Sequence, residues 1–186
     1  LEFQYDSRGN VTWMRDARDI ESTFTYDAGG NLTERKEASN TASPRSTKFT
    51  YDAVGNLAAV TDANNRTRGF VYDAFGNVLE EKDALGNTSR IAYDSLFRLS
   101  SVTDALARSV NYTYNSLDQL TRIQTSLGTI NYGYDAKGNL NLVTDARGNQ
   151  TLYTYDPTTG DLLQTVDGLG NTVRYTTKKP CGKCVN

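Results

Sequence analysis

Aspartate is the residue type in this chain whose number and spacing could support chemistry. Aspartate and glutamate together number 22, whereas histidine is absent. Without histidine the chain lacks the commonest general base, the triads that depend on it and the usual ligand of catalytic zinc. Carboxylates can still bind calcium through their oxygens, so the positions of the aspartates decide which role they have.

Seven of these aspartates follow a tyrosine at a regular interval. The Tyr-Asp pair occurs at Tyr5-Asp6, Tyr26-Asp27, Tyr51-Asp52, Tyr72-Asp73, Tyr93-Asp94, Tyr134-Asp135 and Tyr155-Asp156, and Tyr114-Asn115 fills the one gap. The intervals are 21, 25, 21, 21, 21, 20 and 21 residues, so nearly the whole chain is one small unit present eight times. An aspartate in the same place of every unit most simply accepts backbone N–H bonds in a turn.

Calcium binding is the alternative role for these aspartates. The sequence Asp-x-x-Gly-Asn offers several oxygen atoms around a tight turn. It lacks the further carboxylates of an EF-hand and the Gly-Gly-x-Gly-x-Asp pattern of calcium-binding β-repeats. We therefore expect a structural role, no catalytic residue and no cofactor or metal.

The two cysteines, Cys181 and Cys184, lie in an irregular tail over residues 178–186. A haem attachment site would need histidine where the chain has Val185, and a zinc site would need a second pair of ligands. A thioredoxin-like motif would need a helix start beside a parallel sheet, which the sequence does not indicate. A disulfide, within the tail or between chains, and two free thiols are the alternatives that remain. Oxidising conditions outside the cell would favour the disulfide.

Each unit predicts two short strands and two turns. The residue two before each tyrosine is large and apolar, as at Phe49 before Tyr51, and a spacing of two places both side chains on one face of a strand. Gly-Asn follows most Tyr-Asp pairs, and a second turn sequence begins about eleven residues after each tyrosine. Turn signals at this spacing indicate an all-β protein of consecutive antiparallel hairpins without substantial helix.

Some local features depart from the simple pattern. Leu99 and Val102 are three residues apart, which indicates either a β-bulge or a strand covered on both faces. Residues 37–45 lengthen the second unit and predict a longer surface loop. Two units lack Gly-Asn, which predicts turns of another type at Phe97-Arg98 and Asp118-Gln119.

Together the units predict one repeat domain over residues 1–177, with about sixteen strands. Sheets of more than about ten strands seldom stay flat, so we expect a long curved or spiralling sheet. Its tyrosines could stack on sugar rings, but cross-strand packing of tyrosine over tyrosine is the expected role.

The sequences from Tyr51 to Leu57 and from Tyr134 to Leu140 resemble the YD repeat of RHS proteins, Tc toxin C components, wall-associated proteins and teneurins. The resemblance covers roughly residues 3–175. It implies a β-sheet wound into a hollow shell, which in the toxin relatives encloses a cytotoxic C-terminal domain. It also implies an extracellular or cell-surface location.

Charge and hydropathy exclude two classes of partner. The net charge is -2 and the 20 basic residues are spread along the chain, so no basic stripe is available for nucleic acid. No apolar run reaches membrane-spanning length, so we expect no membrane insertion. The chain begins inside the repeat, which is typical of a fragment.

We therefore expect a non-catalytic structural segment of an RHS-like secreted or surface protein, whose shell encloses cargo such as a toxin domain. Its expected partners are further YD repeats of the same or a neighbouring chain. The alternative is a self-associating extracellular fibre subunit, or an adhesion or carbohydrate-binding module that uses its end strands and tyrosine face. Both end strands would expose unpaired backbone groups unless they are capped.

Overall fold

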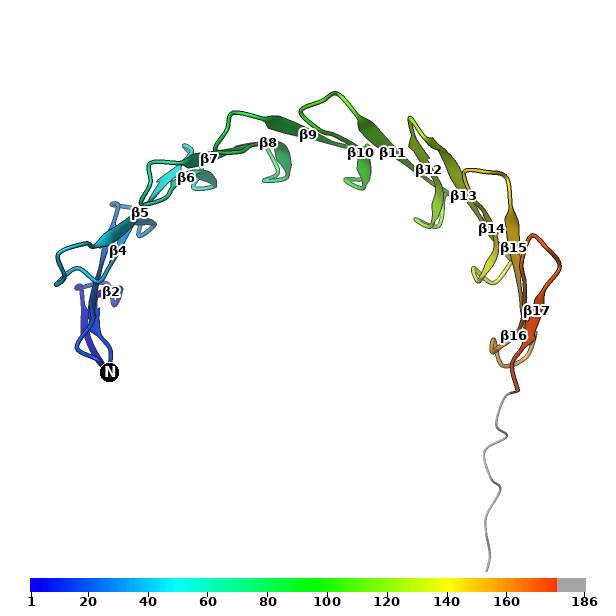
Figure 1. Cartoon of the computed structure of the whole chain (residues 1–186), viewed down its shortest axis with the longest axis horizontal. Coiled ribbons are helices and arrows are strands. Elements are labelled where there is room, and N and C mark those ends of the chain that lie inside the picture. Colours follow the sequence, from blue (N-terminus) through cyan, green and yellow to red (C-terminus); the bar gives the residue numbers. More distant parts are fainter. Residues whose placement is uncertain (177–186) are drawn as a thin grey trace, which may run out of the picture. The chain divides into compact units, whose positions relative to one another are not determined.

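The computed structural model describes residues 1–176, and this part of the chain contains seventeen strands and no helix. The strands follow one another in chain order, as the colours of Figure 1 show. They group into two compact units, Leu1–Ala92 with Asp104–Leu106, and Tyr93–Thr103 with the residues from Ala107 onwards. The all-β, antiparallel prediction is confirmed. The single repeat domain over residues 1–177 stays a prediction, and the tail with Cys181 and Cys184 lies outside the described residues.

In the first unit each strand pairs antiparallel with the strand that follows it in sequence. The strands are β1 (Glu2–Tyr5), β2 (Val11–Arg15), β3 (Glu21–Tyr26), β4 (Leu32–Glu37), β5 (Arg45–Tyr51), β6 (Leu57–Thr61), β7 (Thr67–Tyr72), β8 (Val78–Lys82) and β9 (Thr88–Tyr93). Neighbours in sequence are therefore neighbours in the sheet, as the hairpin pattern predicts.

The second unit repeats this arrangement. Its strands are β10 (Leu99–Thr103), β11 (Ser109–Tyr114), β12 (Leu120–Thr125), β13 (Gly128–Tyr134), β14 (Leu140–Thr144), β15 (Gln150–Tyr155), β16 (Leu162–Val166) and β17 (Thr172–Arg174). The predicted tyrosines close the odd-numbered strands up to β15, so each turn with Tyr-Asp leads into an even-numbered strand.

A β-bulge follows each of these turns and keeps the apolar residues on one face. Tyr51 lies opposite Leu57 and Phe49 opposite Val60, so the register skips Ala58. Without the skip, Leu57 and Val60 would point to opposite faces, because side chains alternate along a strand. The same register shift occurs in the corresponding hairpins. Leu99 and Val102 have the same spacing of three, and a bulge at that place stays a prediction.

No apolar side chain of residues 1–176 is buried, and Ser22 is the one buried residue there. The apolar face is half-buried by its own side chains. Aromatic rings lie on every second strand, so Tyr112 stands opposite Ile123 and Tyr132 opposite Val143. The expected packing of tyrosine over tyrosine is therefore wrong, since a strand without a tyrosine on this face lies between successive tyrosine-bearing strands. Within the described residues the recorded ring pair is Phe3–Tyr5, 6.3 Å apart in one strand.

In six repeats the tyrosine hydroxyl instead connects the repeat to the preceding one. Tyr134 Oη donates to the carbonyl of Leu120 at 2.7 Å, and Leu120 begins the neighbouring strand β12. The ladder between β12 and β13 starts only at Arg122 and Asn131, so the hydroxyl reaches a carbonyl beyond the paired residues. Five further tyrosines make the same bond at 2.8–3.0 Å: Tyr26 to Val11, Tyr51 to Leu32, Tyr72 to Leu57, Tyr114 to Leu99 and Tyr155 to Leu140.

The aspartate after each tyrosine holds the turn closed. In the turn that begins at Asp73, Oδ1 accepts the N–H groups of Phe75 and Asn77 at 2.8 and 2.9 Å, and Oδ2 accepts Nδ2 of Asn77 at 2.9 Å. Gly76 adopts a φ of 87°, a conformation that glycine accepts without strain. The turns on the opposite edge, such as that from Asp83 to Asn87, use the same bonds.

The prediction of a different turn type at Phe97-Arg98 and Asp118-Gln119 is wrong. Phe97 and Asp118 adopt φ values of 61° and 60°, in the place where glycine stands elsewhere. The backbone bonds are unchanged, since Asp94 N donates to Arg98 O at 2.9 Å and Phe97 N to Asp94 O at 3.0 Å. The side-chain bonds of Asp94 therefore hold the turn shape even where the residue in the positive-φ position is unfavourable.

The longer loop predicted in the second unit is present between β4 and β5. Asn40 folds back from this loop, donating through Nδ2 to Asp19 O at 2.7 Å and accepting Glu21 N–H at 3.1 Å. The extra residues are thus bonded to the neighbouring turn.

The substitution Tyr134→Phe tests the bond between repeats. It removes one hydroxyl and leaves the Leu120 carbonyl without this partner, so we expect a loss of about 1 kcal/mol in the free energy of unfolding. Urea unfolding followed by circular dichroism measures it. Tyr132→Phe on the same strand face is the control and should be near neutral, and an equal effect of the two substitutions would contradict the assignment.

The turn aspartates predict a loss of stability in acid. Hydrogen bonds from Asn77 and from turn N–H groups lower the pKa of Asp73, and side-chain and backbone bonds likewise lower the pKa of Asp6, Asp27, Asp52, Asp83, Asp135, Asp145 and Asp167. The unfolded chain therefore binds protons more readily than the folded chain. The stabilisation is complete above the unfolded pKa of about 3.9 and is lost as the pH falls through the lower folded values.

Urea midpoints between pH 7 and pH 2 should accordingly be constant down to about pH 5 and fall steeply below about pH 4. Asp73→Asn, which copies the natural Asn115 of the same slot, should make that fall shallower. A midpoint that is constant down to pH 2 would contradict the role of the carboxylates.

Candidate functional site

Most turns of the described chain hold a single aspartate, and the aspartates do not form a metal centre. No group of three His, Cys, Asp or Glu side chains that could hold a metal ion occurs within residues 1–176. In the turns that end in asparagine, both carboxylate oxygens already accept hydrogen bonds from the turn itself. These bonds favour the structural role of the aspartates over calcium binding.

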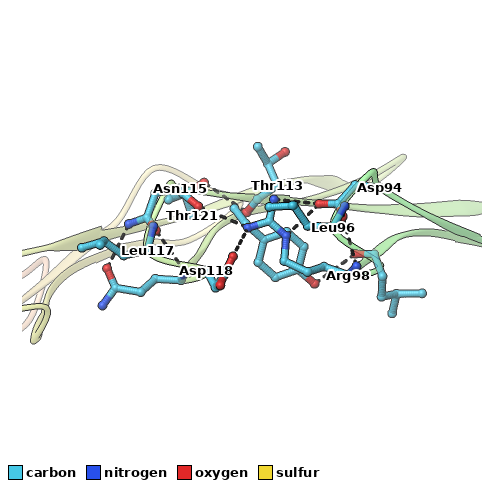
Figure 2. A network of polar contacts seen from close by, with 11 residues as sticks. Asp94, Leu96, Arg98, Thr113, Asn115, Leu117, Asp118 and Thr121 are labelled. Carbon is cyan, nitrogen blue, oxygen red and sulfur yellow. Dashed lines mark hydrogen bonds and ion pairs between the residues drawn. The ribbon is translucent and has the colours of Figure 1, made fainter.

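The densest polar network of the second unit surrounds Arg98, which stands where other repeats have asparagine (Figure 2). Its Nε donates to Asp94 Oδ2 at 2.8 Å, as the asparagine amide does elsewhere. The longer side chain also reaches the next turn, donating through one terminal nitrogen to Asp118 Oδ1 at 2.6 Å and to Asn115 O at 3.2 Å. The guanidinium carbon lies 4.7 Å from the centre of the Tyr114 ring.

Two further side chains connect the following turns of this unit. Gln119, which also stands in the asparagine slot, donates through Nε2 to Gly138 O at 2.7 Å. Lys137 donates through Nζ to the carbonyl of Pro157. Arg98, Gln119 and Lys137 therefore link four successive turns along one edge, and we call these three residues the turn clasp.

Arg98 and Asp94 each stabilise the charged form of the other. The hydrogen bond from Arg98 lowers the pKa of Asp94, and the same bond raises the pKa of Arg98. Asp118 is largely exposed, so its ion pair with Arg98 is weakened by water and by salt. The clasp therefore holds neighbouring turns together mainly by position. The Arg98 side chain is kept in place by the less exposed Asp94 and by the ring of Tyr114.

Sequence reasoning identified the residues of the regular turns but missed the clasp. The signal was present in the replacement of Gly-Asn by Phe97-Arg98 and Asp118-Gln119. Of the predicted tyrosines, six make the bond between repeats, whereas Tyr5 in the first strand is more than half exposed.

A membrane-spanning helix is not found, because no helix of the described residues has the necessary length and apolar character.

Replacing Arg98 with asparagine tests the clasp. The substitution restores the residue of the regular turn, keeps a donor for Asp94 and removes the reach to Asp118 and Tyr114. We expect the melting temperature to fall by about 2–4 °C, since a single surface contact is lost. Arg147→Asn, which changes an arginine on the opposite edge, is the control, and an unchanged melting temperature for Arg98→Asn would show that the clasp contributes nothing.

Solved structures with a similar fold include TcdB2-TccC3 and a Tc holotoxin pore. The crystal structure of TcdB2-TccC3 matches with a TM-score of 0.71 and 16% identity, over 94% of this chain and 11% of that chain. A Photorhabdus luminescens Tc holotoxin pore with a substituted TccC3 matches with a TM-score of 0.61 and 16% identity, over 83% of this chain and 9% of that chain. At this identity the likeness shows the fold, and the chain spans about a tenth of those proteins.

No curated protein sequence matches the chain. The family model described as the teneurin YD-shell matches residues 1–159, which is most of the chain. That match covers the tyrosine bonds between repeats, the aspartate turns and the clasp residues. The chain belongs to the teneurin YD-shell family.

Proposed function

We propose that this chain is a non-catalytic structural segment of a secreted or cell-surface protein, and that its repeats help to wall a hollow shell around cargo such as a toxin domain. The observation that carries the proposal is the single-layered sheet whose repeats are bonded only to their neighbours. Such a sheet can be lengthened one repeat at a time, since each repeat contacts only the next. A shell wall has to cover a large area and needs no reactive centre.

The distribution of polar groups supports a passive wall. The aspartates and tyrosines, which are the residues available for chemistry, are engaged in turns and in bonds to carbonyl groups. Two ion pairs, Arg68–Glu81 and Arg35–Glu37, neutralise charges that lie on the aromatic face of the first unit. Paired charges of this kind suit the lining or outside of a container better than a catalytic cleft.

An antibody raised against residues 1–176 tests the proposal on the parent protein in its source cells. We expect the antigen in the secreted or surface fraction, within a chain longer than 186 residues. Protease added to the native protein should leave an internal fragment that is digested once the protein is unfolded. Antigen confined to the cytosol, or digestion at equal rates in the native and unfolded states, would contradict enclosure.

A self-associating fibre is the second candidate, favoured by the two end strands. β1 and β17 are exposed along their whole length, and the described pairings give each of them one neighbour, β2 and β16. An uncovered strand edge offers unpaired N–H and C=O groups to another chain. Successive copies joined in this way would make an open filament.

The substitution Arg174→Pro tests end-to-end pairing. Tyr175 N donates to Leu163 O in the β16 region, so the N–H of Arg174, one residue away, points to the open side of β17. Proline there removes an outward donor and spares the contact with β16. Light scattering at rising concentration should show polymers of the natural chain and none of the variant. The comparison with reductant present tests whether Cys181 and Cys184 cross-link the joint, and a monomer at every concentration would contradict the fibre.

A further inference from the structure

The lengthened loop between β4 and β5 lies beside a cavity of about 290 Å³. Pro44 at the end of the loop lines one side, and the neighbouring turn with Asp62 and Asn65 lines the other. This is the place where the interval between tyrosines is 25 residues rather than 20 or 21. In repeat proteins, insertions into single repeats often form the binding face. The extra residues therefore give this repeat a surface that the regular pattern does not produce.

The cavity lies on the face of the sheet opposite the aromatic rings. Lys36 and Lys48 line it, and in the ladder between β4 and β5 they stand opposite Ser46 and Glu34. Phe49 belongs to the aromatic face, and side chains alternate along a strand, so Lys48 points to the other side of the sheet. The cavity is therefore separate from the tyrosine face that stacking on sugar rings would use.

The two lysines of this cavity keep their charges unpaired. Glu34 stands directly opposite Lys48, yet its carboxylate accepts a hydrogen bond from the hydroxyl of Ser46. Within residues 1–176 neither Lys36 nor Lys48 takes part in an ion pair. Side chains at diagonal positions of a ladder are about 7–8 Å apart, so the two ammonium groups can contact one small anion from two sides.

The turn beside the cavity also leaves an acceptor open. Asp62 Oδ1 accepts the N–H groups of Asn64 and Arg66 at 2.8 and 2.9 Å, as in the regular turns. In a turn such as that of Asp73 the second carboxylate oxygen accepts the amide of an asparagine, but here Arg66 occupies the asparagine slot. Among the residues that the structure describes, Oδ2 of Asp62 has no hydrogen-bond partner. This oxygen is therefore free to accept a hydrogen bond from a ligand.

We propose that the cavity binds an acidic sugar, a single hexuronate ring whose carboxylate lies between the two lysines and whose hydroxyls bond to Asp62 and Asn65. The ammonium groups donate, the Asp62 oxygen accepts and the Asn65 amide does both, which matches a ligand with a carboxylate and hydroxyls. The volume is at the lower end of the range of ligand pockets, so it fits one ring better than an oligosaccharide. Inorganic phosphate would place a like charge beside Asp62, and a neutral sugar would leave both ammonium groups without a partner. The site adds a binding function to the structural role proposed above.

Binding should be weak, because exposed ammonium groups are screened by water and by salt. Two-dimensional amide NMR of the whole chain in reductant, with sodium glucuronate added up to about 50 mM at constant ionic strength, covers the millimolar range. We expect saturable shifts of the backbone amides of Ser46, Asp62 and Asn65. Glucose and inorganic phosphate, titrated in the same way, should bind at least about fivefold more weakly, since each lacks one of the two kinds of group that the cavity matches.

Two variants test the residues of the cavity. Lys36→Gln combined with Lys48→Gln should weaken glucuronate binding at least about fivefold. Ser46→Ala keeps every positive charge but releases Glu34 to pair with Lys48, so binding should weaken in this variant as well. Lys82→Gln is the matched control, because Lys82 lies on the same face in β8 but outside the cavity, and this variant should bind like the natural chain.

The same spectra separate this site from the structural role, because their dispersion reports the folded β-sheet. A folded chain that binds no glucuronate would overturn the site and leave the structural role standing. Equal binding of glucose or phosphate, shifts spread evenly along the chain, or binding that survives the double lysine variant would also overturn it. Unchanged binding in Ser46→Ala would contradict the arrangement that keeps Glu34 away from Lys48.

Discussion

The bond from the tyrosine hydroxyl of six repeats to a carbonyl of the preceding hairpin is the interaction on which the rest of the structure depends. The sheet of each unit has no second layer and no buried apolar core in its described residues, so the hydrophobic effect acts only through contacts on one face. The backbone ladder between hairpins stops before the start of each even-numbered strand, as at Leu120. The tyrosine closes that gap with its ring on the apolar face and its hydroxyl on the carbonyl. Tyrosine suits the position because it combines an apolar ring with a hydrogen-bonding tip.

The turns fix the geometry within each hairpin. A turn aspartate such as Asp73 holds its own loop with three hydrogen bonds, so the register of one hairpin is fixed before it meets the next. Fixed register matters in a sheet with one apolar face, because a slip of one residue would turn every aromatic side chain to the opposite side. The bulge after the turn then restores the alternation that the spacing of Leu57 and Val60 would otherwise break. Local bonds thus replace the shared core of an ordinary domain.

Much of this could be predicted from the sequence, because the repeat places the same residues in the same slots. The strands, the antiparallel hairpins and the role of aspartate as a turn residue follow from Tyr-Asp and Gly-Asn at a fixed period. The partner of the tyrosine hydroxyl could not be predicted, since it depends on where the ladder between hairpins ends. Tyrosine does not stack on tyrosine, because a strand that contributes residues such as Ile123 and Val143 to this face lies between two tyrosine-bearing strands. The sequence marked Arg98 as irregular, but its reach to Asp118 depends on the distance between neighbouring turns.

Removal of one repeat tests most directly whether neighbouring bonds alone hold the sheet together. Deletion of residues 135–155 joins Tyr134 to Asp156, so the turn still begins with Tyr-Asp and Tyr134 keeps its acceptor at Leu120. The circular dichroism per residue should then equal that of the natural chain, and thermal unfolding should remain cooperative, because no distant contact is lost. Loss of the β-signal on this deletion would show that stability depends on contacts beyond the neighbouring repeat and would contradict the account.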